Sequence, residues 1–337
     1  MEILAITWVA TAIVAFFVAA WLGKKLIPVL HRLKFGQTIR EEGPAWHKSK
    51  QGTPTMGGII FIAAMLITAV LAILVSQLFL PVKVIGPVHS TGDTTKLFVG
   101  LILAVGFGAI GFLDDFIKVV RKRNLGLTSK QKMAAQLLVS AAYAVTMYLT
   151  DATQMYVPFY GYWEAGIWFI PIAMFILVAM TNATNLTDGI DGLCASVSLV
   201  AFLFLLVLCG AATMGYGIVV SAMAGALAGF LVWNFHPARV FMGDTGSLFI
   251  GGILCAVAFG LGHPLMLALL GIVYVAETLS VMLQVTYFKI THGKRLFKMS
   301  PLHHHFEMSG WSENKIVAVF CSVTVVAGAL CLVLLFV

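Results

Sequence analysis

The sequence predicts an all-α polytopic membrane protein of about ten transmembrane helices, and three observations lead to this fold class. First, 60% of the 337 residues are hydrophobic and only 10% are charged, whereas soluble domains carry roughly 25% charged residues. Second, apolar runs of about bilayer-crossing length recur along the whole chain. Third, the basic residues gather in alternate loops between these runs. Because lipid cannot satisfy an open strand edge, the runs are expected to be helices.

Ten apolar runs are predicted to cross the membrane. The first is a retained span rather than a cleavable signal, because its basic cluster follows the run instead of preceding it. Several later runs are short or contain glycines, so their ends are predicted only to within a few residues. The chain, residues 1–337, is expected to form a single integral membrane domain. The runs are Ile3–Leu22, Met56–Leu80, Leu97–Leu113, Met133–Leu149, Ile167–Thr181, Leu193–Cys209, Tyr216–Trp233, Leu248–Leu261, Leu265–Phe288 and Ile316–Val337.

Basic residues set the predicted orientation, because cytoplasmic loops are enriched in Lys and Arg. Of the 21 Lys and Arg residues, all but Lys83 and Lys96 lie in loops on one side. That side is predicted to be cytoplasmic, which leaves both termini outside. The net charge of +7 is assigned to this topology and to anionic lipid heads, and no nucleic-acid partner is expected. The loops are Gly23–Thr55, Asp114–Lys132, Asn182–Gly192, Asn234–Ser247 and Lys289–Lys315.

Five aspartates occupy three of these loops, each at the end of a predicted span. They are Asp114, Asp115, Asp188, Asp191 and Asp244. A carboxylate beside hydrocarbon is costly, so acids placed there are candidates for function. Carboxylate oxygens suit a hard cation, and Mg²⁺ typically takes one or two of them together with substrate phosphates and water. The sequence therefore predicts a shared cation site at one face. No paired Cys or helical His pattern indicates zinc.

Helix capping is the alternative explanation for these acids. Asp188 would cap the sixth span and Asp244 the eighth. Capping accounts for single acids better than for five acids gathered at one face. Glycines beside them, such as Gly189 and Gly243, would let the backbone approach a ligand closely. The junction Asp244-Thr-Gly-Ser could also offer free N–H groups to a phosphate.

Basic and histidine side chains complete the candidate site. Most of the lysines are explained by topology, but Lys118, one helical turn after Asp114, and Lys130 are the stronger site candidates. The last cytoplasmic loop contains Ser300-Pro-Leu-His-His-His-Phe-Glu. Histidine can donate to phosphate oxygens or transfer protons near neutral pH. Joint metal binding by three adjacent histidines is the weaker interpretation, because consecutive side chains diverge. Glu277, inside the ninth run, requires a partner within the helix bundle.

Six segments in order resemble the bacterial phospho-N-acetylmuramoyl-pentapeptide transferases, which belong to the polyprenyl-phosphate N-acetylhexosamine-1-phosphate transferase superfamily. Each segment alone is a weak signal, but the ordered set across essentially the whole chain is specific. The segments are Gly52-Thr-Pro-Thr-Met-Gly-Gly, Leu113-Asp-Asp-Phe, Asn182-Ala-Thr-Asn-Leu-Thr-Asp-Gly-Ile-Asp-Gly-Leu, Asn234-Phe-His-Pro-Ala, Met242-Gly-Asp-Thr-Gly-Ser and Pro301-Leu-His-His-His-Phe-Glu.

The resemblance implies a reaction, a cofactor and a location. It implies ten transmembrane helices and a homodimer in the bacterial cytoplasmic membrane, with a Mg²⁺ requirement. The implied substrates are UDP-MurNAc-pentapeptide and undecaprenyl phosphate, and the implied products are lipid I and UMP. The triple histidine favours the muramyl-pentapeptide branch over the branches that use N-acetylglucosamine phosphate.

Residue roles carried over by position form three groups. Asp244 is the expected Mg²⁺ ligand, and Asp114 with Asp115 is the expected essential acid pair. The other expected catalytic residues are His303, His304, Lys118 and Lys130. Phe241 is expected to stack near the uracil ring. The complete substrate-binding set is Lys48, Thr53, Asn185, Asp188, Asp191, Asn234, Phe241, Gly243 and Gln284.

The implied reaction explains this set of residues. Both reactants are anions, so a divalent ion and lysines would reduce their repulsion and stabilise the leaving UMP. Asp114 or Asp115 is expected to deprotonate or position the lipid phosphate. Adjacent helical residues point about 100° apart, which suggests different roles for the two. Direct in-line displacement is favoured, although a covalent phosphoaspartate also fits the sequence.

Two other functions remain open at the level of sequence. The nearer is a sister transferase that uses UDP-GlcNAc, and testing both nucleotide sugars would distinguish them. The more distant is a membrane transporter. Transporters usually place charges near the bilayer midplane, where Glu277 is the one candidate in this sequence, whereas the aspartates gather at one face.

Overall fold

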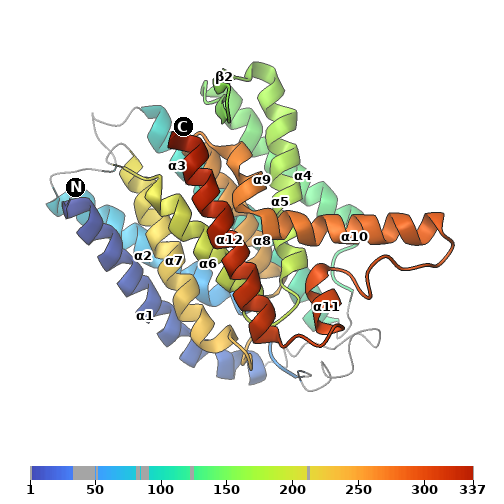
Figure 1. The fold of residues 1–337 in the computed structure, drawn as a ribbon. Helices are drawn as coiled ribbons and strands as arrows, with labels where there is room; N and C mark the ends of the chain where they lie inside the picture. The colour runs from blue at the N-terminus through green and yellow to red at the C-terminus, as the bar shows by residue number, and fades with distance from the viewer. Residues whose placement is uncertain are drawn as a thin grey trace.

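The computed structural model describes residues 2–32, 50, 52–80, 84, 91–121, 125–210 and 213–336. Within them the chain is almost wholly helical (Figure 1). The longer helices are α1 (Glu2–Arg32), α2 (Gly58–Phe79), α3 (Thr91–Val120), α4 (Ser129–Leu149), α5 (Phe169–Thr187), α6 (Leu193–Val207), α7 (Met214–Asn234), α8 (Gly243–Gly260), α10 (Ile272–Ile290) and α12 (Glu313–Phe336). The shorter ones are α9 (Leu267–Leu270), α11 (Leu302–Glu307) and the 3₁₀ turns η2 (Gly166–Trp168) and η4 (Pro264–Met266).

The helices confirm a polytopic membrane fold. Each predicted apolar run falls on a helix, as far as the described residues extend. Within the described part of the chain, seven helices are long and apolar enough to cross a membrane, and the bent pair Pro264–Leu270 and Ile272–Ile290 would make an eighth. Helix α6 is apolar but shorter. The count of ten spans and the outside location of both termini stay predictions.

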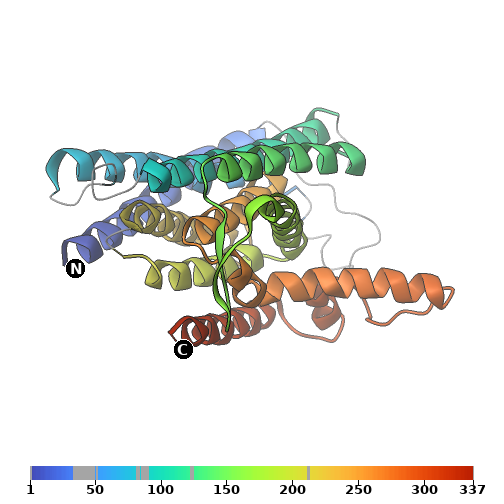
Figure 2. The same ribbon diagram turned by 90° about the horizontal axis from the view of Figure 1, so that it is seen from above.

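Two central helices organise the bundle. The apolar windows of α7 and α8 are each 83% buried, compared with 22% for α1. Helix α7 packs against α1, α2 and α6, and α8 packs against α3, α5 and α2. In Figure 2, α3 and α4 lie along one side of the molecule and α10 and α12 along the other. The outer helices turn residues such as Phe17 and Leu78 outward, as expected where lipid is the solvent.

Helix α3 approaches α8 closely. Gly111 makes this possible, because a Cβ placed there would lie only 2.0 Å from the backbone oxygen of Asp244. The absence of a side chain at Gly111 therefore lets the end of α3, with its two aspartates, lie against the start of α8.

The ninth predicted run is not one continuous helix. It is broken between Pro264–Leu270 and Ile272–Ile290, and the two parts are bent by 75°. The break falls at Gly271, which caps α9 and precedes α10. Beyond the bend, α10 projects away from the bundle (Figure 1). Its outer residues include Leu283 and Ile290, which are 53% and 71% exposed.

A small β-hairpin adds to the predicted all-α fold. Strands β1 (Gln154–Val157) and β2 (Gly161–Glu164) pair antiparallel, with Met155 opposite Trp163. In Figure 1 the hairpin and both marked chain ends lie toward one end of the bundle, and α11 lies toward the other.

Candidate active site

Three aspartates meet where the end of α3 lies against the start of α8. Each of Asp114, Asp115 and Asp244 offers a carboxylate oxygen, and these three oxygens lie within 4.8 Å of one another. Asp114 and Asp115 are almost fully buried, while the Asp244 side chain is 19% exposed. Residues 130 positions apart in the sequence therefore form one acidic site, which contains three of the five aspartates that were predicted to share a cation.

Two lysines contact this acidic site. Lys118 Nζ lies 2.6 Å from Asp114 Oδ2 and 3.0 Å from Asp244 Oδ2. Lys132 Nζ, from the first turn of α4, lies 2.9 Å from the same Asp244 oxygen. We call Asp114, Asp115, Asp244, Lys118 and Lys132 the Asp244 cluster. Its three carboxylates face two ammonium groups, so negative charge is in excess.

Lys132 takes the place that the sequence analysis gave to Lys130. Lys130 is exposed, and within the described residues it makes no recorded contact with the Asp244 cluster. The two positions lie two residues apart on α4, so their side chains point to different faces. The sequence offered no basis for choosing between them, because the facing side is set by how α4 packs.

Asp115 caps α8. The first-turn N–H groups of a helix have no partner inside it, and here Asp115 supplies one. Its Oδ2 accepts from Thr245 N at 2.9 Å and from Thr245 Oγ1 at 2.7 Å, and its Oδ1 accepts from Asp244 N at 3.3 Å. Gly243 adopts a positive φ of 69° and leaves room, because a Cβ there would lie 2.5 Å from Asp115 Oδ2.

Asp114 is held differently from its neighbour. Its Oδ1 accepts from the backbone N–H of Leu127 at 2.8 Å, and its Oδ2 pairs with Lys118. Asp114 therefore contacts the loop before α4, and Asp115 contacts the start of α8. The two acids therefore differ in their contacts, and the difference in their roles stays a prediction.

The end of α5 brings two polar residues, Asn185 and Asp188, to the Asp244 cluster. Asn185 Nδ2 donates to Asp244 Oδ1 at 2.9 Å and to Ser247 Oγ at 3.1 Å. Asp188, the C-cap of α5, is largely buried, and burial together with the negative charges of Asp244 and Asp115 raises its pKa to about 8. Neither predicted capping role applies, because α6 begins after Gly192 without a side-chain cap and α8 is capped by Asp115.

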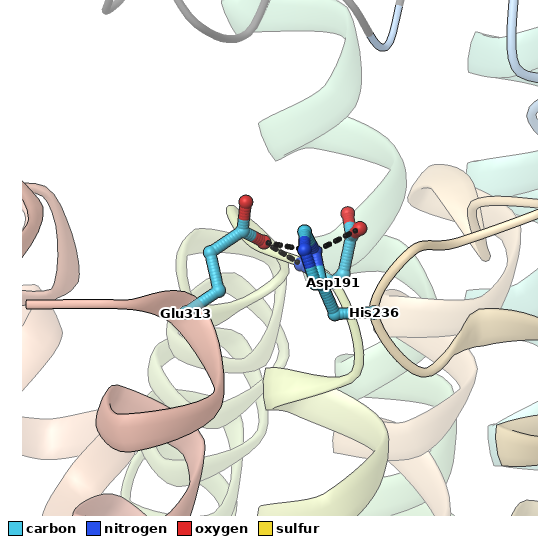
Figure 3. A group of neighbouring side chains, drawn as sticks. All are labelled: Asp191, His236 and Glu313. Atoms are coloured by element: carbon cyan, nitrogen blue, oxygen red, sulfur yellow. Dashed lines mark hydrogen bonds and ion pairs between the residues drawn. The ribbon is translucent and has the colours of Figure 1, made fainter.

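Asp191 belongs to a second cluster. Its Oδ1 accepts from Lys50 Nζ at 2.8 Å, and its Oδ2 lies 3.0 Å from His236 Nδ1 and accepts from Ala238 N at 2.9 Å. Lys50 also lies 2.7 Å from the carboxylate of Glu313. Figure 3 shows the His236 ring between the carboxylates of Asp191 and Glu313. We call these four side chains, Asp191, Glu313, Lys50 and His236, the Asp191 cluster.

The predicted uracil-side residues lie on two paired backbone segments. Phe241 N donates to Pro54 O, and Gly57 N donates to Phe241 O, both at 2.8 Å. This pairing brings Thr53 and Phe241 into neighbouring segments that lead into α2 and α8. Asn234 fastens the second segment, because its Nδ2 donates to Val240 O at 2.9 Å. Stacking of Phe241 on uracil stays a prediction, and Lys48 lies outside the described residues.

The candidate site residues Gln284, His303 and His304 have different partners in the structure. Gln284 fastens the loop after α10, since its Oε1 accepts from Leu296 N and Phe297 N at 3.0 and 2.9 Å. His303 is fully buried against Glu277 of α10, at 3.1 Å. His304 lies 2.6 Å from Glu307 on the same short helix α11. The partner that the sequence required for Glu277 is therefore His303.

The donor sets decide which cluster fits a divalent cation. The Asp244 cluster offers three carboxylates with negative charge in excess, and carboxylate oxygens are what Mg²⁺ prefers. The ammonium group of Lys118 already lies beside all three of these carboxylates. The Asp191 cluster also has three possible ligands within 4.8 Å. There, however, one of the three ligands is the His236 ring rather than a carboxylate, and Lys50 contacts both acids.

Known proteins similar to this chain carry one family name. A phospho-N-acetylmuramoyl-pentapeptide-transferase from Clostridium perfringens (strain SM101) is 48% identical over 320 residues, which cover 94% of each chain. The relative from Heliobacterium modesticaldum is 47% identical and covers 94% of each chain. The one from Staphylococcus saprophyticus is 44% identical and covers 94% of this chain and 96% of its own.

The chain belongs to the phospho-N-acetylmuramoyl-pentapeptide-transferase family.

Two family models match segments of the chain that contain candidate site residues. The phospho-N-acetylmuramoyl-pentapeptide-transferase signature 1 matches residues 50–62, which begin at Lys50 of the Asp191 cluster and include Thr53. The model described as glycosyl transferase family 4 matches residues 97–262, which contain all members of the Asp244 cluster. Sequence reasoning missed Lys132, His236 and Glu313 as site neighbours. Each is a single polar residue beside a predicted span, and only packing brings it to an aspartate.

Proposed function

We propose that this protein transfers phospho-MurNAc-pentapeptide from UDP-MurNAc-pentapeptide to undecaprenyl phosphate, giving lipid I and UMP. The observation that carries the proposal is the Asp244 cluster, in which carboxylates and lysines from three helices meet at one end of the bundle. The reaction would occur at the cytoplasmic face of the bacterial cytoplasmic membrane, as the distribution of basic residues favours. We further propose that residues 1–337 act as one domain, in line with a hydrophobic core shared by α1 to α12.

The site must first reduce the electrostatic repulsion between its two reactants, because both carry negatively charged phosphate. Lys118 and Lys132 supply positive charge where the reacting phosphates would meet. We propose that Asp244, with Asp114 or Asp115, holds a Mg²⁺ ion at the same place. When bound, the ion would neutralise phosphate charge and stabilise the leaving UMP. Asn185 keeps the Asp244 carboxylate oriented through a 2.9 Å hydrogen bond.

The two neighbouring aspartates take separate roles in this proposal. Asp115 positions Asp244, because both of its carboxylate oxygens accept from the first turn of α8. Asp114 is engaged by Lys118 and by one backbone N–H group. Asp114 is therefore the better candidate to accept a proton from the lipid phosphate when that phosphate arrives protonated.

Direct displacement balances without any covalent enzyme intermediate. An oxygen of the lipid phosphate forms a bond to the sugar-linked phosphorus of the UDP-sugar. The bond from that phosphorus to the bridging oxygen of UMP breaks, and its electron pair leaves with UMP. One diphosphate linkage replaces another, so no ATP is required. A phosphorylated aspartate trapped with the nucleotide sugar alone would contradict this route.

The nucleotide sugar is placed on the side of α5 and the paired segments at Thr53 and Phe241. Asp188 and Asn185 lie at the end of α5 beside the Asp244 cluster. Substrate contacts by Lys48, Thr53, Asp188, Asp191, Asn234, Phe241, Gly243 and Gln284 remain part of the proposal. So does a homodimer, which follows from the family resemblance and which the exposed apolar face of α1 would allow.

Release of UMP tests the proposed function. Purified protein in lipid nanodiscs should release UMP from UDP-MurNAc-pentapeptide only when undecaprenyl phosphate and Mg²⁺ are both present. Replacing the donor by UDP-GlcNAc should give little product, whereas efficient use of UDP-GlcNAc would indicate a sister transferase. Solute uptake by proteoliposomes without UMP release would indicate a transporter.

A further inference from the structure

Glu277 is a fully buried acid of α10 that belongs to neither the Asp244 cluster nor the Asp191 cluster. It is 0% exposed. An ionised carboxylate in such a place is retained only with a good partner. Its neighbour one turn on, Ser280, donates to the Glu277 backbone oxygen rather than to the carboxylate.

Both carboxylate oxygens of Glu277 are used by one residue. His303 Nδ1 lies 3.1 Å from Oε2, and the backbone N–H of His303 donates to Oε1 at 3.1 Å. A carboxylate accepts hydrogen bonds, so this contact requires the His303 proton to be on Nδ1. Two contacts from one acid fix both the place of the residue and the orientation of its ring. A carboxylate that holds an imidazole in this way sets which nitrogen is offered to other groups.

Among the residues that the structure describes, the other ring nitrogen of His303 has no partner. His303 Nε2 is buried, and within the described residues it makes no hydrogen bond. It faces Gly189, where a Cβ would lie 2.1 Å from this nitrogen. Gly189 itself is exposed and sits beside Asp188, in the loop proposed to bind the nucleotide sugar. A buried polar atom without a partner is costly, and here it lies directly beneath a residue with no side chain.

We propose that Glu277 is a positioning residue that holds His303 with its Nε2 turned toward the nucleotide-sugar loop, where Nε2–H donates to the diphosphate of the bound UDP-sugar. Because Glu277 engages Nδ1, Nε2 is the ring nitrogen left for a ligand, and a histidine that carries a proton there is a donor suited to a phosphate oxygen. This inference rests on the proposed function, in which the nucleotide sugar binds beside Asp188. It assigns a role to Glu277, which is not part of the Asp244 cluster.

The first experiment is a double-mutant cycle in the full chain. Glu277→Gln keeps the shape of the side chain but removes the charge and one acceptor oxygen. We expect it to lower kcat/KM for UMP release on the order of 10–100-fold, as loss of an orienting partner typically does. His303→Ala should cost at least as much, and Glu277→Gln in the His303→Ala background should cost little more. Additive losses would overturn the inference, because Glu277 would then act independently of His303.

Ser280→Ala is the matched control. It removes a buried polar group one turn away on the same helix, without touching His303. Its thermal unfolding should change about as much as that of Glu277→Gln, while its kcat/KM stays within about threefold of the parent. If Ser280→Ala and Glu277→Gln lose activity equally, the effect belongs to α10 packing and the inference fails.

A readout that needs no turnover separates this inference from the proposed function. Protein carrying ¹⁵N-histidine is titrated with UDP-MurNAc-pentapeptide, and the His303 Nε2 resonance is assigned by its loss in His303→Ala. We expect this resonance to move on ligand addition in the parent protein and to stay in place in Glu277→Gln. No movement in the parent would overturn the inference even if UMP is released. Movement without UMP release would support it and contradict the proposed function.

Discussion

The Asp244 cluster and the Asp191 cluster use the same residue types for different ends. In the Asp244 cluster three carboxylates face two lysines, and Asp244 remains partly exposed. In the Asp191 cluster two carboxylates share Lys50 and His236, and both oxygens of Asp191 are occupied. In formal charge, with His236 neutral, each cluster carries one negative charge in excess: three carboxylates against two lysines in the first, and two carboxylates against one lysine in the second.

The contrast shows why grouped acids alone do not identify a catalytic site. Both clusters offer three possible metal ligands within the same distance. What distinguishes them is the kind of ligand, because the Asp244 cluster offers three carboxylates whereas the Asp191 cluster offers two carboxylates and an imidazole. We therefore interpret the Asp244 cluster as the reaction site. We interpret the Asp191 cluster as a structural contact that holds Lys50, the loop at His236 and the start of α12 together.

The largest expected effect is loss of the central acid. Asp244→Asn keeps the shape of the side chain but removes one of three negative charges. We expect UMP release to fall on the order of 10²–10³-fold, as when a group that stabilises transition-state charge is removed. Turnover is compared at saturating Mg²⁺, with thermal unfolding as the control for folding. Turnover within about threefold of the parent would remove Asp244 from the reaction.

A matched pair of lysines sharpens the boundary of the Asp244 cluster. Lys132→Gln removes a charge 2.9 Å from Asp244, so UMP release should fall on the order of 10–100-fold. Lys130→Gln changes an exposed side chain two residues away and should alter UMP release by about twofold at most. The same assay with both variants decides between the two positions. The reverse order would restore the assignment of Lys130 made from the sequence.

A variant in the other cluster should affect stability more than chemistry. Glu313→Gln weakens the contacts to Lys50 and to the backbone N–H of Asp191. Loss of a largely buried charge partner should cost about 1–3 kcal/mol of folding free energy. Thermal unfolding should therefore occur at a lower temperature, while UMP release stays within about threefold. A large loss of turnover with unchanged stability would place the Asp191 cluster in the reaction.

The smallest expected effect concerns pH and Asp188, whose pKa is raised by burial and by negative charges from both clusters. Its pKa in the folded protein, about 8, is above the ordinary aspartate value. The folded state therefore keeps a proton that the unfolded state has already lost, and stability falls as pH rises from about 4 toward 8. Asp188→Asn should flatten this part of the stability curve, measured by unfolding with EDTA present. An unchanged slope would show that Asp188 is ionised in the folded protein.

Much of the fold could be predicted from the sequence. Apolar runs predicted the helices, because bilayer chemistry allows few alternatives. The bend at Gly271 was not predicted, since Pro264 and Gly271 are compatible with either a continuous or a broken helix. The hairpin at Gln154–Glu164 was also missed, because two four-residue strands carry too short a pattern.

The site was predictable where neighbours in sequence are also neighbours in space. Lys118 was identified because it follows Asp114 by one turn, and the structure confirms their contact. The partner of Glu277 and the choice of Lys132 over Lys130 depend on how α10, α11 and α4 pack. Asp115 was expected to act chemically, whereas its contacts with Thr245 indicate that it caps α8. Such contacts between distant segments have no local signal in the sequence.

Binding of Mn²⁺, observed by electron paramagnetic resonance, tests most directly which cluster holds the cation. Mn²⁺ favours the same oxygen ligands as Mg²⁺ and can be counted without turnover. Parent protein and Glu313→Gln should each bind one ion per chain, and Asp244→Asn should lose it. Retention of the ion in Asp244→Asn and its loss in Glu313→Gln would contradict the account, because the cation would then belong to the Asp191 cluster.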